Sequence, residues 1–60
     1  MPNLSQVEIN SIREAVTCHQ TASNKLSHYA EQCQDQNIKQ MFGKAAQDAQ
    51  KSAQTLIQMM

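Results

Sequence analysis

The stretch Cys33-Gln34-Asp35-Gln36-Asn37 divides the chain into two runs of regularly spaced apolar residues. Asp35 and Asn37 can each begin a helix, because a side-chain oxygen there accepts hydrogen bonds from the free N–H groups of the first turn. The apolar repeat also changes phase across this polar cluster. We therefore predict two antiparallel helices joined by a turn. Because no proline or glycine enforces that turn, a single unbroken helix of about 55 residues is the alternative.

The first helix is predicted over residues 6–34. Ser5 and Glu8 fit a capping box, in which each side chain accepts a hydrogen bond from the other residue's backbone N–H, and Leu4 can pack on Ile9 as a hydrophobic staple. Apolar or small residues then recur at alternating spacings of three and four, as in an amphipathic helix. This main line consists of Ile12, Ala15, His19, Ala22, Leu26, Tyr29 and Cys33. A second line beside it consists of Ile9, Val16, Ser23 and Ala30.

The second helix is predicted over residues 37–59, with an apolar repeat of the same spacing. Its main line consists of Ile38, Phe42, Ala45, Ala49, Ser52, Leu56 and Met59, flanked by Met41, Ala46, Ala53, Ile57 and Met60. A hairpin places the two main lines against each other, with Tyr29 opposite Phe42. Because small residues form the middle of both lines, we expect the helices to approach closely. Gly43, on the flank, is tolerable there and can mark the approach of another backbone.

Composition supports an all-α protein and argues against several classes of function. The 60 residues include one glycine and one proline, and the glutamines are spread singly between apolar positions, as on the uncharged solvent side of a helix. Five basic and five acidic side chains give zero net charge, which argues against nucleic-acid binding. No apolar run approaches the ~20 residues of a membrane span, and the start lacks signal-peptide features, so we expect a cytoplasmic protein.

One hairpin of this length cannot bury all its apolar residues, since each stripe is wider than the seam of a two-stranded coil. We expect a strip to remain that consists of Ile9, Val16, Met41, Ile57 and Met60. We therefore predict that the single domain of residues 1–60 forms a homodimer, an antiparallel four-helix bundle. The predicted dimer-interface residues are Ile12, Val16, His19, Leu26, Phe42, Ala49 and Leu56.

Three segments carry a family resemblance: Tyr29-Ala30 with Cys33, then Ile38-Lys39-Gln40-Met41-Phe42, and finally Leu56-Ile57-Gln58-Met59. Within residues 15–60 this pattern resembles the spore coat protein F family, a ferritin-like helical group of endospore-forming bacteria. The resemblance implies half of a ferritin-like bundle, completed by dimerisation, and a role in the spore coat beside other coat proteins. Ferritin-like di-iron sites use Glu-x-x-His motifs, and this sequence has none, so we expect no iron chemistry.

His19 and Cys18 are the candidate metal ligands, because two copies of each at a twofold axis would make the Cys2His2 set that zinc prefers. Adjacent residues on a helix diverge by about 100°, however, so one chain cannot easily direct both side chains to one ion. The alternative is a partly buried His19 that hydrogen-bonds Ser52 or Asp48 across the hairpin. Cys18 and Cys33 lie about 22 Å apart on one helix, too far for an internal disulfide, so they are free thiols unless one cross-links two chains.

We expect no enzymatic activity and no cofactor, because no arrangement of nucleophile and base is recognisable in two helices. The sequence thus predicts a structural or protein-interaction module. A metal-binding bundle, with its site at the dimer axis, is the alternative.

Overall fold

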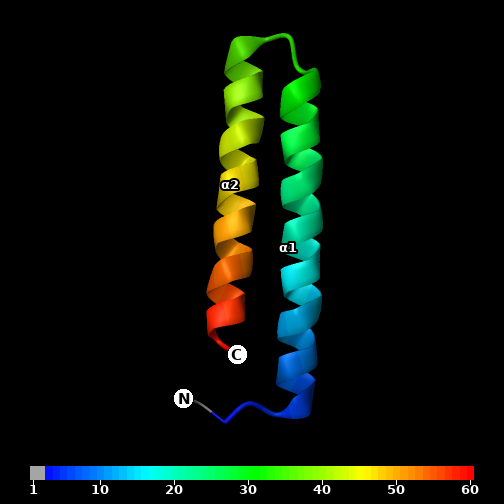
Figure 1. The fold of residues 1–60 in the computed structure, drawn as a ribbon, viewed down its shortest axis with the longest axis vertical. Coiled ribbons are helices and arrows are strands. Elements are labelled where there is room, and N and C mark those ends of the chain that lie inside the picture. The colour runs from blue at the N-terminus through cyan, green and yellow to red at the C-terminus, as the bar shows by residue number, and fades with distance from the viewer. Residues whose placement is uncertain (1–2) are drawn as a thin grey trace.

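The computed structural model describes residues 3–60 as two α-helices that lie side by side and run in opposite directions (Figure 1). Helix α1 spans Gln6–Gln32 and helix α2 spans Gln36–Gln58. No strand occurs among these residues, so the predicted all-α hairpin is confirmed and the single unbroken helix is excluded. Neither of the two described helices is long and apolar enough to cross a membrane.

The turn between the helices is shorter than the polar cluster. Helix α1 ends two residues earlier than predicted because Cys33 has an extended backbone (φ −75°, ψ 135°), although its N–H still donates to carbonyls of the last turn. Helix α2 begins and ends one residue earlier than predicted. Its cap is Asp35, whose carboxylate accepts hydrogen bonds from the N–H groups of Asn37 (2.9 Å) and Ile38 (3.1 Å). Of the two capping candidates, Asp35 is therefore the one used.

The N-terminus of α1 has the predicted capping box. The Glu8 N–H donates to the Ser5 hydroxyl oxygen (3.1 Å), and the Ser5 N–H donates to the Glu8 carboxylate (2.9 Å). Before α1 begins, residues 3–5 cross the open end of the hairpin, beneath the end of α2 (Figure 1). There Leu4 and Ile9, the predicted staple pair, line one shallow hollow together with Met60.

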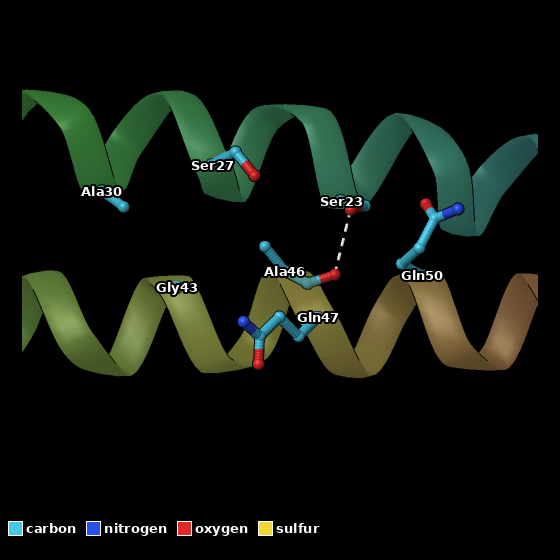
Figure 2. Close-up of a pocket in the computed structure, with 7 residues that line it drawn as sticks. All are labelled: Ser23, Ser27, Ala30, Gly43, Ala46, Gln47 and Gln50. Atoms are coloured by element: carbon cyan, nitrogen blue, oxygen red, sulfur yellow. Dashed lines mark hydrogen bonds between the residues drawn. The ribbon is translucent and has the colours of Figure 1, made fainter.

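Small side chains form the seam between the helices. Its buried residues are Ile12 and Ser23 on α1, and Ala46 and Ala53 on α2. Ala53 is 0% exposed, and the Ser23 hydroxyl donates a 2.9 Å hydrogen bond to the backbone carbonyl of Ala46 (Figure 2). A serine hydroxyl reaches the backbone of another helix only where the two backbones lie close together. The seam is therefore narrow, as the small residues predict.

The centre of the seam is not where the sequence predicts it. Most of the buried residues come from the predicted second and flanking lines, whereas Ser52 and Met59 of the predicted main line are exposed. The predicted pairing is correct at the turn end, where the ring centroids of Tyr29 and Phe42 lie 5.8 Å apart at an interplanar angle of 59°. Both helices are thus rotated about their axes relative to the prediction, which moves the main lines to one side of the hairpin.

The hairpin is a thin rod with little interior. Its Cα atoms extend over 47 × 16 × 9 Å, and their radius of gyration is 14.2 Å. A compact domain of this length has a radius of gyration of about 10 Å. No large side chain among the described residues is fully buried. One hairpin therefore lacks the second layer that helical domains use to bury an apolar stripe.

Candidate functional site

Two hollows on the same side of the hairpin mark a candidate interaction surface. One is lined by Leu26, Ile38, Met41, Phe42 and Ala45, and the other by His19, Lys51, Ser52, Thr55 and Leu56. His19 and Leu26 are seven residues apart on α1, and Ser52 and Ala45 are seven apart on α2. Seven residues are nearly two full helical turns, so both hollows open on one side.

We call this surface the apolar face. By the same helical spacing it comprises Ala15, His19, Ala22, Leu26, Tyr29, Ile38, Met41, Phe42, Ala45, Ala49, Ser52, Leu56 and Met59. Its large side chains are well exposed: Met41 is 70% exposed, Met59 49%, Ile38 47% and Tyr29 46%. None of these residues is Asp, Glu, Lys or Arg, but Lys51 lines the second hollow, and Asp48, seven residues after Met41, lies at the outer edge of the face. The two predicted main lines thus form most of a continuous open surface instead of the seam.

The opposite side of the hairpin is polar. Its hollow, of about 400 Å³, is lined by Ser23, Ser27, Ala30, Gly43, Ala46, Gln47 and Gln50 (Figure 2). We call this side the glutamine face, and helical spacing adds to it Gln20, Asn24 and Gln54. Apart from the Ser23 hydroxyl, no side chain that lines this hollow makes a side-chain hydrogen bond within residues 3–60. The exposed side-chain amides of this face can form hydrogen bonds with solvent water.

The predicted interface residues are divided between the apolar face and the seam. The apolar face holds His19, Leu26, Phe42, Ala49 and Leu56. Ile12 is buried in the seam, and Val16, two helical turns before Ser23, lies half-buried beside it. The apolar face also holds Tyr29 and Ile38, which are not among the predicted interface residues, and Met41, which the sequence analysis places in the exposed strip. Their exposure depends on how the helices are rotated, which the apolar repeat does not specify.

The strip of apolar residues predicted to remain exposed does not exist as one surface. Met41 belongs to the apolar face, whereas Ile57 lies two turns after Gln50, toward the glutamine face. Ile9 and Met60 line the hollow at the open end. The apolar surface left for a partner is therefore the apolar face.

The candidate metal ligands are not brought together within one chain. His19 is half-buried and lines a hollow with Ser52, whereas Cys18 is exposed and diverges from it by about 100°. Within residues 3–60 no three His, Cys, Asp or Glu side chains are placed to hold a metal ion. No hydrogen bond from His19 to Ser52 or Asp48 forms among these residues, although His19 does face Ser52 as predicted. A site shared between two copies remains a prediction.

The other predicted polar groups are structural or exposed. His28 is exposed, and its ring nitrogen Nε2 lies 3.3 Å from Nε2 of Gln32. Cys18 and Cys33 are both free thiols. The capping hydrogen bonds lower the pKa of Glu8, first through the Ser5 N–H and then through the Ser5 hydroxyl.

The geometry defines a class of protein: an antiparallel two-helix hairpin with one apolar and one polar face. Comparisons with family models, with curated proteins and with solved structures found no match.

Proposed function

We propose that this protein is a non-enzymatic interaction module whose apolar face packs against the same face of a second copy, so that two hairpins form a four-helix bundle. The observation that carries this proposal is the exposure of the apolar face in the single hairpin. In soluble proteins an amphipathic helix buries its apolar stripe against a second layer of secondary structure. A single hairpin has no second layer.

The exposed area fits one partner of the same size. The hairpin has 4748 Å² of accessible surface, whereas a folded monomer of 6.7 kDa exposes about 3,900 Å². The excess of about 800 Å² equals what each partner buries in an interface of standard size. A second copy supplies a surface of matching length and chemistry, and twofold self-association is the commonest way to use it.

The chemistry of the two faces favours the apolar face over the glutamine face. Charged residues are depleted in the cores of interfaces, and aromatic residues and Met are enriched. The apolar face contains Tyr29, Met41 and Phe42, and its two charged neighbours, Lys51 and Asp48, lie at its edge. On the glutamine face, burial would remove the amides of Gln47 and Gln50 from water.

The resemblance to the spore coat protein F family provides a biological setting for this proposal. In that setting the dimer is a building unit of a proteinaceous layer, with other coat proteins as partners. The experiments below test self-association itself, which does not depend on that setting.

The test compares Met41→Glu with Gln47→Glu by light scattering at several concentrations. Both variants add one negative charge to α2, but Met41 is 70% exposed on the apolar face and Gln47 is exposed on the glutamine face. Because Met41 is mostly exposed in the single hairpin, its replacement leaves the fold intact. We expect the native protein and Gln47→Glu to have about twice the mass of one chain, 6.7 kDa. In Met41→Glu the buried charge should weaken the dimer by about 3 kcal/mol, or about 100-fold in Kd.

A folded native monomer at all concentrations would overturn the proposal, as would a Met41→Glu variant that dimerises as tightly as Gln47→Glu. A metal assay on the same peak tests the alternative function. One zinc or iron ion per dimer, with stability lost on chelation and in His19→Ala, would favour a metal-binding bundle. We expect neither chelation nor the presence of metal to change the mass.

A further inference from the structure

We infer that the two copies pack with their turns at opposite ends of the bundle, so that α1 lies on α1 of the second copy and α2 on α2. This inference rests on the proposed dimer and specifies its geometry. The twofold axis crosses the helices at right angles, near Ala22 on α1 and between Ala45 and Ala49 on α2. By the helix bounds and the Ser23–Ala46 contact, these alanines lie at the middle of the overlap between the helices.

The argument begins with the uneven shape of the apolar face. Its bulky side chains gather in the half nearest the turn: Leu26, Tyr29, Ile38, Met41 and Phe42. The middle consists of small side chains: Ala22, Ala45, Ala49 and Ser52. In the half toward the termini, the face has the small Ala15 on α1. On α2, only Leu56 and Met59 are large side chains in this half. The bulkier half of the face therefore lies at the turn end, around a hollow of its own, whereas the half toward the termini has smaller side chains and a second hollow lined by His19, Ser52 and Leu56.

Two face-to-face arrangements have twofold symmetry. If the axis runs along the helices, both turns lie at the same end and α1 of one copy lies on α2 of the other at the same height. Tyr29 then meets Phe42 of the second copy, and Ala22 meets Ala49. Bulky side chains are crowded at one end while small ones leave space in the middle, and both overpacking and cavities destabilise an interface core.

If the axis crosses the helices, the bulkier half of one copy meets the half of the other copy that has smaller side chains. By helical rise, Tyr29 then lies over Ala15 of the second copy and Leu26 over His19. On the other helix pair, Phe42 lies over Ser52 of the second copy and Ile38 over Leu56. The layers of Tyr29 with Ala15 and of Phe42 with Ser52 combine large with small side chains, which is how well-packed cores reach native density. The hollow beside His19 is then occupied by an aliphatic side chain.

The inference also bears on the metal alternative. With the axis near Ala22, the two copies of His19 are offset along the bundle by about six residues, or about 9 Å. That offset is too large for both rings to bind one ion, since Zn–N bonds measure about 2 Å. The turn-opposed bundle therefore has no shared histidine site.

Cysteine cross-linking distinguishes the two arrangements. The background is the full chain with Cys18→Ser and Cys33→Ser, whose dimer mass is first confirmed by light scattering. Ala22→Cys is then added, with Asn24→Cys as the matched control, because Asn24 lies at nearly the same height on the glutamine face. A disulfide needs Cα atoms within about 7 Å, which two copies of residue 22 satisfy only at a crossing axis. We expect Ala22→Cys to form covalent dimers under mild oxidation at least about ten times faster than Asn24→Cys.

The competing arrangement is tested by mixing ¹⁵N-labelled Ala22→Cys with unlabelled Ala49→Cys. A mixed disulfide between the two chains, detected by mass, with little self-linking of Ala22→Cys, would overturn the inference and place both turns at one end. Equal rates for Ala22→Cys and Asn24→Cys in a confirmed dimer would overturn it as well. A monomeric background would instead refute the proposed dimer, so the two failures are distinguishable.

Discussion

Gly43 lies half-buried within α2, at a position where glycine is less stable than alanine. Its φ is not positive, and a Cβ atom added there would meet no atom within 4 Å. Helical glycine costs about 1 kcal/mol relative to alanine, because its unfolded chain has more freedom to lose. We therefore expect Gly43→Ala to stabilise the protein by about 1 kcal/mol, measured as a rise in the thermal midpoint at fixed protein concentration.

The outcome for Gly43→Ala also tests whether a second chain packs on the glutamine face. If a second backbone packed closely on the glutamine face, the new methyl group would collide with it, and Gly43→Ala would lower the midpoint. A rise of several degrees is consistent with a solvent-filled hollow on this side.

Ser23 shows why the seam could not be predicted residue by residue. The apolar repeat identifies two broad stripes, but two helices approach most closely where side chains are smallest. That condition selects Ser23, Ala46 and Ala53 for the seam and turns the larger Leu26 and Phe42 to one side. The buried Ser23 hydroxyl is tolerated because the Ala46 carbonyl accepts its hydrogen bond, a partner that only the folded structure supplies.

At the scale of the element, the helix ends were the most predictable feature. The capping box of Ser5 and Glu8 depends on residues three apart, so a short sequence window contains all of it. The choice between Asp35 and Asn37 as the second cap could not be made from the window alone. Both can cap, and the choice depends on how early the chain leaves α1 at Cys33.

The capping box predicts a pH dependence of the first turn of α1. Hydrogen bonds from Ser5 hold the pKa of Glu8 below its ordinary value, so the folded state favours the carboxylate. A lowered pKa stabilises the helix end at pH above the ordinary value, and this contribution is lost as pH falls through the pKa of the folded state. We expect the first-turn amides to lose protection from hydrogen exchange as the pH falls below 4.5, the ordinary pKa of a glutamate, and through the lower pKa of the folded state.

The matched variant is Glu8→Gln, which keeps an acceptor for the Ser5 N–H but does not titrate. In Glu8→Gln, the protection factors of the first-turn amides should not change over the same pH range, after correction for the intrinsic pH dependence of hydrogen exchange. Glu14→Gln, on an exposed position of the same helix, serves as the control and should behave like the native protein. Identical pH profiles for Glu8→Gln and the native chain would show that the carboxylate does not hold the first turn.

At the scale of the whole molecule, the sequence predicts correctly that one hairpin leaves apolar surface uncovered, but not which surface. The strip expected from the sequence combines residues that the fold separates, such as Met41 and Ile57. The rotation of each helix determines the surface, and that rotation follows from the packing of small residues across the seam. The width of an apolar stripe can be read from the sequence of one helix. The rotation of each helix about its axis depends on how the two helices pack together.

In the proposed dimer, a rod with so little interior would gain much of its stability from association. No large side chain of residues 3–60 is fully buried, so the hairpin alone is expected to be much less stable than the proposed dimer. Dilution then favours the unfolded chains, because one folded dimer yields two of them. We expect the thermal midpoint to rise by several degrees for each tenfold increase in protein concentration, which changes the dimer's stability by about 1.4 kcal/mol. The measurement is a series of circular dichroism melts.

In Met41→Glu, at concentrations where it is monomeric, the thermal midpoint should be lower than in the native protein and independent of concentration. A midpoint of the native protein that stays constant over a thousandfold range would mean that the hairpin is stable alone and that its apolar face is not required for folding.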